Sequence, residues 1–422
     1  MTPEHVQRTY LVLITLQTLA ASLIWGINTL FLLDAGLSLT GAFVANAAFT
    51  AGMVLFEVPT GVVADTFGRR VSFILGAATL LVTTAAYLGL WYVQAGIGWW
   101  ILVSALIGLG FTFFSGATEA WLVDALHATG FDGAMETVFG RGQTAAGAAM
   151  LIGTVGGGFL GQVNLGLPYV ARSVLLLAVI VAAWLWMHDI GYQPTRGVAV
   201  GEQVRGILRS SMRHGLGNPP VRMLMLAAPF ASGVGIWAFY AFQPYLLQLF
   251  GDPDATYLAG IAAAIFALAQ MVGGASVDRV RRRFRTRTAV LAAMVAIGAV
   301  ALIGVGLAQA LPIPAGFWVA IALLAVFMLG STVASPIQQA YMNGCIPSEQ
   351  RATILSFSSL LGSAGGVVAQ PALGRVADVF SLGAGYVVAG VVYAIGLPFI
   401  LAVRKMRLPA DLVQIEPATE PS

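Results

Sequence analysis

Two glutamates, Glu57 and Glu119, lie inside long apolar stretches of this 422-residue chain. Each ends a row of polar residues with helical spacing: Asn46, Thr50 and Glu57 in one stretch, and Thr112, Ser115, Gly116 and Glu119 in the other. Lipid cannot satisfy polar groups, so we expect both rows to face the interior of a helix bundle. A carboxyl group at such depth is costly to bury and indicates function by default.

The chemistry open to a carboxyl group in this setting is the binding and release of a proton. We predict proton coupling through Glu119 first and Glu57 second, and Asp34, near the end of another apolar stretch, is a third candidate. The alternative for each glutamate is a static hydrogen bond to a neighbouring hydroxyl or backbone carbonyl.

The stretches that carry these residues are long enough to cross a bilayer, which takes roughly 20 apolar residues in a helix. Apolar residues make up 58% of the chain and charged residues 9%, whereas a soluble domain has about 25% charged residues. We predict an all-α membrane protein with twelve transmembrane helices. Their expected positions are residues 10–33, 41–63, 71–93, 98–122, 142–164, 170–188, 223–249, 256–277, 288–310, 315–340, 353–375 and 383–403.

The distribution of basic residues orients these spans. With the N-terminus in the cytoplasm, only Arg172 and Arg375 of the 21 basic residues fall on the outer side. This bias follows the positive-inside rule, and an odd number of spans would scatter the charges over both faces. We therefore expect both termini to be cytoplasmic.

One short connection between two spans, Gly61–Arg70, carries two glycines, one aspartate and two arginines. Part of it recurs 213 residues later. The recurring pairs are Gly61 and Gly274, Asp65 and Asp278, Arg69 and Arg282, and Arg70 and Arg283. A second echo joins the glycine-rich segments 153–157 and 362–366. Two echoes at nearly the same offset indicate an internal duplication, which is typical of a transporter built from two halves.

The connection resembles the signature between the second and third helices of the major facilitator superfamily, at every charged position and at both glycines. This resemblance implies two pseudo-symmetric six-helix bundles around a central substrate path, which rock between inward-open and outward-open states. It gives an N-terminal bundle at 1–188, a cytoplasmic linker at 189–222, a C-terminal bundle at 223–403 and a cytoplasmic tail at 404–422.

The resemblance also implies a conformational latch at the cytoplasmic face. Its residues are Gly61, Asp65, Gly68, Arg69, Arg70, Asp124 and Asp278. In the family the aspartate meets the N-terminus of the eleventh helix, here near 349–352, and Asp124 is the natural partner of Arg69. We expect Gly61 to permit a close helix approach and Gly68 a tight reversal. The alternative is that these charges only fix the topology.

Further polar and aromatic residues are expected to line the substrate path. They are Gln17, Trp25, Asn28, Ser115, Trp237, Tyr240, Ser335 and Gln338. Aromatic rings and amides with few fixed charges favour a small lipophilic or cationic solute. Packing or interfacial anchoring is the alternative for each of these side chains.

The pattern is most similar to drug:proton antiporters, with two departures. Ser104 stands where those exporters usually carry an arginine before Gly108-Leu-Gly110, and the fifth span lacks the proline expected near Gly153. We therefore predict proton-coupled efflux, with proton-coupled or facilitated uptake of a small metabolite as the alternative.

Other functional classes find little support. The four histidines lie at span ends or in loops and pair neither with Cys345 nor with a carboxylate at recognisable spacing, so we expect no enzyme, no metal site and no cofactor. The expected partners are a small-molecule substrate, protons and membrane lipid, without nucleic acid, and the chain is expected to be a monomer. Its arginine-rich, alanine-rich composition favours the inner membrane of a GC-rich bacterium.

Two polar segments complete the chain. In the linker, Arg205, Arg209 and Arg213 share one helical face, while the apolar residues Val204, Ile207 and Leu208 lie on another. This arrangement favours either a surface helix on anionic lipid or a solvated basic linker. The tail after Arg407 is polar and is expected to be disordered.

Overall fold

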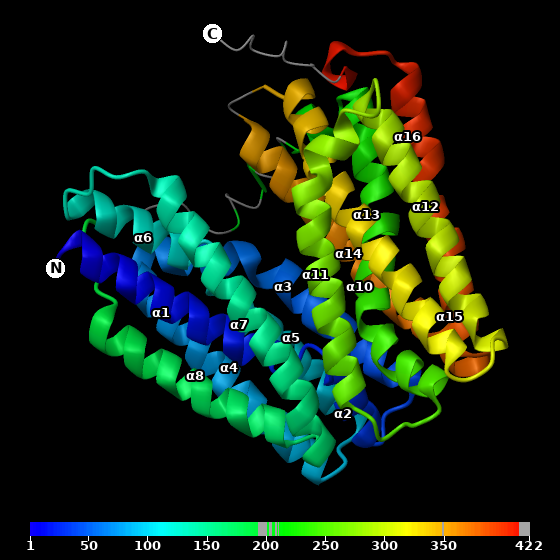
Figure 1. Cartoon of the computed structure of the whole chain (residues 1–422). Coiled ribbons are helices and arrows are strands. Elements are labelled where there is room, and N and C mark those ends of the chain that lie inside the picture. Colours follow the sequence, from blue (N-terminus) through cyan, green and yellow to red (C-terminus); the bar gives the residue numbers. More distant parts are fainter. Residues whose placement is uncertain (193–200, 202–204, 207–208, 210, 348–349, 413–422) are drawn as a thin grey trace, which may run out of the picture. The chain divides into compact units, whose positions relative to one another are not determined.

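The computed structural model describes residues 1–192, 201, 205–206, 209, 211–347 and 350–412. This part of the chain is helical, apart from one isolated β-bridge between Thr286 and Leu412. It divides into two compact units (Figure 1). Unit 1 comprises 1–204, 239–264 and 370–378, and unit 2 comprises 205–238, 265–369 and 379–422.

Unit 1 contains the first eight α-helices. They are α1 (Pro3–Ser22), α2 (Asn28–Asp34), α3 (Leu39–Phe67), α4 (Arg69–Tyr92), α5 (Ile97–Thr112), α6 (Ala117–Ala128), α7 (Met135–Val163) and α8 (Leu167–Trp186). Helix α3 packs on α5, α1 on α7 and α8, and α4 on α5 and α8. The α3–α5 contact depends on glycine, because a Cβ atom at Gly52 would lie 2.3 Å from the carbonyl oxygen of Ala105.

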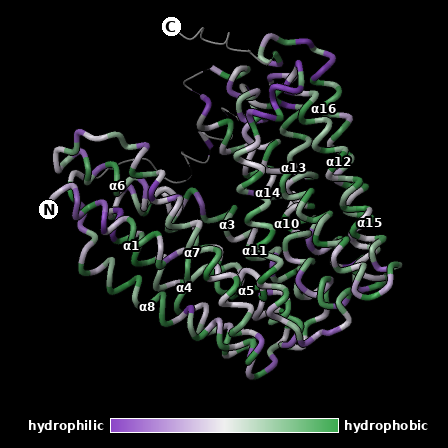
Figure 2. The backbone as a smooth tube through the Cα atoms, in the orientation of Figure 1, coloured by the Kyte–Doolittle hydropathy of each residue, from purple (hydrophilic) through white to green (hydrophobic). Residues whose placement is uncertain are grey.

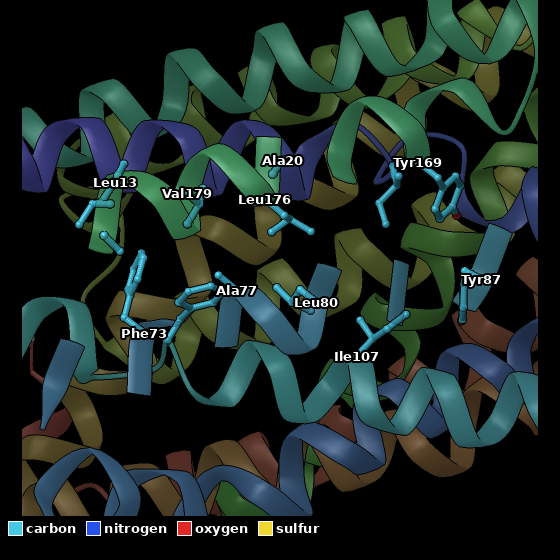
Figure 3. Packing of buried hydrophobic residues seen from close by; sticks show 14 of the residues in the cluster. Leu13, Ala20, Phe73, Ala77, Leu80, Tyr87, Ile107, Tyr169, Leu176 and Val179 are labelled. Atoms are coloured by element: carbon cyan, nitrogen blue, oxygen red, sulfur yellow. The ribbon is translucent and has the colours of Figure 1, made fainter. Parts of the chain in front are cut away.

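Helix α8 shows how a membrane helix divides between lipid and protein. Its apolar residues Val170, Val174, Leu177, Val181 and Trp184 are 47–64% exposed, as expected of a lipid-facing side. The opposite face contributes Tyr169, Leu176 and Val179 to the buried core of unit 1, where they lie near residues of α4 such as Ala77 and Leu80 (Figure 3).

Unit 2 contains most of the second half of the chain. Its helices are α10 (Pro219–Phe250), α11 (Tyr257–Arg281), α12 (Arg287–Leu307), α13 (Ala315–Cys345), α14 (Arg351–Val379), α15 (Leu382–Ala394) and α16 (Gly396–Lys405). Shorter pieces are a π-helical segment at Ser211–Leu216 and 3₁₀ turns at Ala308–Ala310 and Pro409–Asp411. The end of α10, the start of α11 and the end of α14 belong to unit 1. Within unit 2, α12 packs on α13, α15 and α16.

Eleven helical segments in the described part of the chain are long and apolar enough to cross a membrane. They correspond to the predicted spans other than the first, where α1 ends at Ser22 and α2 begins only at Asn28. The fourth span is also interrupted, between Thr112 and Ala117, and the twelfth is divided at Ile395 into α15 and α16. Hydrophobic residues dominate the helices, and hydrophilic residues gather at their ends and connections (Figure 2).

The C-terminal tail corrects one expectation, because its first residues are packed. The Asp411 carboxylate is 4% exposed and accepts hydrogen bonds from the backbone N–H and the hydroxyl of Thr288, at 2.8 and 2.7 Å. Arg287 donates to the carbonyl of Ala410. Asp411 therefore caps the first turn of α12, where free N–H groups favour a carboxylate.

The predicted linker helix falls mostly outside the described residues, which include none of Val204, Ile207 and Leu208. The side chains of Arg205, Arg209 and Arg213 are exposed, as both interpretations of the linker require.

Candidate functional site

The signature connection forms a one-residue turn between α3 and α4. Gly68 has φ +109°, a value that L side chains rarely adopt, and a Cβ atom there would lie 2.3 Å from Oδ2 of Asp189. Asp189 follows α8, and its Oδ1 accepts a hydrogen bond of 2.9 Å from the backbone N–H of Arg70 in the first turn of α4. The glycine thus provides both the reversal and the room for a carboxylate that caps α4.

The charges of the connection pair locally. Arg69, the first residue of α4, forms an ion pair across the turn with Asp65, in the last turn of α3. Tyr192 donates from its hydroxyl to the carbonyl of Asp65 at 2.7 Å, and the guanidinium of Arg69 lies 6.0 Å from the centre of its ring. Arg70 donates to the carbonyl of Trp184 at the end of α8. The end of α8 and the segment after it therefore pack against the signature connection.

Burial raises the pKa of the Asp189 carboxyl group, and the N–H of Arg70 partly offsets this effect because it stabilises the ionised form. Sequence analysis missed both Asp189 and Tyr192. The sequence offered one signal for Asp189. This aspartate directly follows the sixth span, and charged residues are scarce in this chain, at 9%.

Other predicted features of the latch are absent from this conformation. Among described residues, Arg69 pairs with Asp65, and no ion pair joins it to Asp124. Apart from its own stretch of α3, no described atom lies within 4 Å of the Cβ position at Gly61, so this glycine does not serve the expected close approach here. Glu349, near the expected partner of Asp65, lies outside the described residues. The Arg69–Asp124 pair remains a prediction for another state.

The second copy of the connection has a different shape. Arg281 replaces the second glycine, α11 ends at this residue, and α12 begins at Arg287 after the capping residue Thr286. Asp278 pairs with Arg281 at 3.3 Å, and its side chain is 76% exposed. An exposed pair of this kind contributes little to stability.

The interruption of the fourth span brings two predicted site residues together. Helix α5 ends at Thr112 and α6 begins at Ala117. Gly116, directly before α6, adopts φ +70°, which is not a helical value. From this break, the Ser115 hydroxyl donates to Oε1 of Glu57 on α3 at 2.6 Å. Glu57 is half-buried. The contact places a carboxylate and a hydroxyl next to backbone that is not helical, as in the ion and substrate sites of many transporters.

Glu119 differs from its expected environment. It lies in the first turn of α6 and is exposed, and it receives no hydrogen bond from a described residue. Protein atoms therefore do not bury Glu119 in this conformation, and its role in proton coupling stays a prediction.

The interruption of the first span is filled by a side chain that sequence analysis missed. Gln243, in the part of α10 that belongs to unit 1, is 0% exposed. Its Oε1 accepts from the backbone N–H of Thr29 at 2.7 Å, and its Nε2 donates to the carbonyl of Trp25 at 2.8 Å. Thr29 also donates from its hydroxyl to the carbonyl of Tyr240 at 2.9 Å. One amide thus satisfies two backbone groups at the helix break.

Within unit 1, two further hydrogen bonds join α3 to the end of α14. The side-chain amide of Gln370 donates to the hydroxyl of Thr50 at 3.1 Å, and the hydroxyl of Thr40 donates to Asp378 at 2.7 Å. Thr50 belongs to the polar row that ends at Glu57, so this row does face protein, as predicted.

The predicted lining residues of unit 1 divide into two groups. Asn28 is buried and engaged, because its amide donates to Asn46 at 2.8 Å and its carbonyl accepts from the hydroxyl of Tyr169 at 2.9 Å. Trp25 and Tyr240 are half-buried beside Gln243. Gln17 is half-buried, and its Oε1 has no hydrogen-bond partner in the described part of the chain.

In unit 2, the predicted lining residues differ in how far they are buried. Trp237 is completely buried and packs edge-on against Tyr386, with ring centres 4.9 Å apart, which corresponds to the packing alternative. Ser335 is exposed and Gln338 is half-buried on α13.

Asp34 ends α2 at the surface of unit 1, where its Oδ2 accepts a hydrogen bond of 2.7 Å from the indole of Trp91. Both residues line a surface hollow of about 410 Å³, together with residues 92–94. In the described part of the chain, no cluster of histidine, cysteine, aspartate or glutamate side chains could hold a metal ion.

Comparisons with known proteins agree with this architecture. The family model described as Major Facilitator Superfamily matches residues 10–369. An uncharacterized MFS-type transporter of Bacillus subtilis (strain 168), YxaM, is 22% identical over 88% of this chain and 89% of its own length.

Among solved structures, the nucleoside transporter NupG is 11% identical, with a TM-score of 0.78 over 95% of this chain and 99% of its own. A bacterial homologue of the human lysosomal transporter Spinster is 14% identical, with a TM-score of 0.70 over 98% of this chain and 99% of its own. At such identities these structures show the fold alone.

Proposed function

Because the chain belongs to the Major Facilitator Superfamily, whose members transport solutes by alternating access, we propose that it is a proton-coupled exporter of a small lipophilic or cationic solute. We place it in the inner membrane of a bacterium, as a monomer with twelve spans in two six-helix bundles and with both termini in the cytoplasm. The proton and the solute are its partners, and it needs no cofactor.

The contact between Glu57 and Ser115 carries the proposal of proton coupling. A half-buried carboxylate that accepts a 2.6 Å hydrogen bond at a helix break can respond to protonation, because the neutral acid no longer attracts the hydroxyl as strongly. The two residues belong to different spans, so protonation at this point would alter how α3 meets the interrupted fourth span. Glu57 therefore becomes the first coupling candidate, and Glu119 the second.

The proposed substrate class rests on the side chains beside the first helix break. Trp25 and Tyr240 provide half-buried aromatic surface, and Gln17 provides an amide oxygen free to accept a hydrogen bond. These groups suit a solute with apolar surface and a positive charge or a hydrogen-bond donor.

Uptake of a small polar metabolite is the second candidate. The solved structures of similar fold include a nucleoside transporter and peptide transporters of the POT family, which move polar solutes. The buried amides Asn28, Asn46 and Gln243 would suit a substrate of that kind after rearrangement.

Transport by the purified full chain in liposomes separates these candidates. A pH-sensitive dye inside the liposomes reports proton movement when lipophilic cations, nucleosides or dipeptides are added to one side. We expect a lipophilic cation to drive proton movement in the opposite direction, and loss of this signal in Glu57→Gln but not in Glu136→Gln, whose carboxylate is exposed at the start of α7. Proton movement in the same direction as a nucleoside or dipeptide would instead establish uptake.

A further inference from the structure

Arg172 is a buried cation that the proposed transport mechanism does not use. It lies on the inner face of α8 and is 1% exposed. Its Nε and both Nη atoms have no hydrogen-bond partner in the described part of the chain, where the two ion pairs involve Asp65 and Asp278. The sequence predicts Arg172 at the outer end of the sixth span. In the structure it lies near the start of α8, with its side chain buried inside unit 1.

The groups around Arg172 are aromatic rings and hydroxyls. The carbon of its guanidinium lies 5.7 Å from the centre of the Phe111 ring. The rings of Tyr87 and Tyr169 are 6.2 Å apart (Figure 3), and both are close enough to interact electrostatically with the guanidinium. Their hydroxyls are engaged elsewhere, since Tyr169 donates to Asn28 and Tyr87 shares a 2.5 Å hydrogen bond with Ser104.

This environment does not compensate the charge. Arginine stays protonated at any pH that the protein meets, so Arg172 carries a full positive charge in the core. A single aromatic face returns only a small part of the cost of burying a charge. Leucine or methionine would fill a similar volume without that cost. The five N–H donors of the guanidinium therefore lack partners in a setting of low polarity, where an anion would be held strongly. Its nitrogen atoms are closed off from solvent in this conformation, so an anion reaches them only when the surrounding side chains move.

We propose that Arg172 binds a monovalent anion inside unit 1. The planar fork of N–H groups matches a carboxylate and also accommodates a halide. The anion is either a small inorganic ion that stays with the protein or the carboxylate of a solute. Neither the proton coupling at Glu57 nor the direction of transport enters this inference.

Thermal unfolding of the purified full chain tests the site. Unfolding midpoints are measured at constant ionic strength with sodium chloride or sodium acetate replacing sodium isethionate, whose anion is larger. We expect a saturable rise of about 2 °C or more in the wild type. A rise with chloride identifies an inorganic anion, and a rise with acetate alone identifies a carboxylate.

Substitutions assign the effect to this arginine. Arg172→Met, which keeps side-chain bulk, should abolish the rise, and Arg172→Lys, which keeps the charge without the fork, should reduce it. Arg375→Gln, which removes an exposed arginine of α14, should leave it unchanged. Anomalous diffraction from wild-type crystals grown in bromide gives a second measurement, and we expect an ion beside the guanidinium. Three results would overturn the proposal. They are a rise of the unfolding midpoint in Arg172→Met equal to that of the wild type, no rise with either anion in the wild type, and bromide ions found only at positions away from Arg172.

Discussion

At the scale of single residues, the two glycines of the signature connection have opposite surroundings. Gly68 combines a positive φ with a carboxylate at its Cβ position. Gly61 lies within α3, and no described atom outside its own stretch of that helix lies within 4 Å of its Cβ position. Their spacing in the sequence cannot reveal this difference, because the partner of Gly68 is Asp189, 121 positions further along the chain. Only the fold brings the two together.

This contrast predicts different outcomes for two matched substitutions. Gly68→Ala should destabilise the protein by about 1–3 kcal/mol, since it forces a strained backbone and displaces the cap of α4. Gly61→Ala should be neutral or stabilising, because alanine favours a helix by about 1 kcal/mol over glycine. Chemical or thermal unfolding in detergent measures both, and a greater loss in Gly61→Ala would contradict this account.

Asp189 should make stability depend on pH with a definite sign. Burial raises the pKa of its carboxyl group in the folded protein, so the folded state holds the proton more tightly than the unfolded state. Its contribution to stability is therefore greatest below the ordinary pKa of aspartate and falls as pH rises through the raised value. Asp189→Asn keeps an acceptor for the N–H of Arg70 and removes the titration.

The measurement is the difference in unfolding midpoint between wild type and Asp189→Asn across the acid range. We expect the wild type to lose stability relative to the variant as the pH rises. A difference that grows in favour of the wild type with rising pH would show that the carboxylate is stabilised, contrary to its burial.

At the scale of elements, the sequence predicts the helices well, because apolar length decides where a chain can cross a membrane. The interruptions were not predicted. The first span reads as one apolar run from 10 to 33, although α1 ends at Ser22, because a helix break leaves little trace when a distant amide satisfies its backbone groups. Gly26 and Gly116 were the available signals in the two broken spans.

Gln243 is expected to hold the first break in its observed form. Gln243→Leu leaves the N–H of Thr29 and the carbonyl of Trp25 without their partner, at a cost of about 1–3 kcal/mol for each buried group. Hydrogen exchange at residues 23–30 should accelerate in this variant. Gln248→Leu, an exposed position on the same helix, serves as the control and should exchange like the wild type. Equal protection in both variants would show that Gln243 does not hold the break.

At the scale of the whole molecule, composition and duplication predict a membrane transporter, and the family match confirms that part. Direction, substrate and coupling ion depend on a few side chains whose neighbours come from distant segments. Ser115 and Glu57 illustrate this limit, since they were assigned to separate roles from sequence yet share a hydrogen bond.

Orientation in the membrane is testable with the one native cysteine. Cys345 ends α13, where the charge bias predicts the cytoplasmic side, and it is half-buried. A membrane-impermeant maleimide should label it in inside-out vesicles and not in right-side-out vesicles. A cysteine placed at the exposed position Gln94 in a Cys345→Ala background should show the opposite pattern. The reverse result would invert the proposed topology.

Uphill transport driven by an imposed pH difference tests the central claim most directly. The purified wild type in liposomes should accumulate a lipophilic cation against its gradient, and Glu57→Gln should bind and exchange the cation without accumulating it, because glutamine keeps the hydrogen bond to Ser115 and cannot titrate. Glu136→Gln should behave as the wild type. Undiminished accumulation in Glu57→Gln would remove Glu57 from the coupling mechanism, and its persistence in the double variant with Glu119→Gln would contradict coupling through either glutamate.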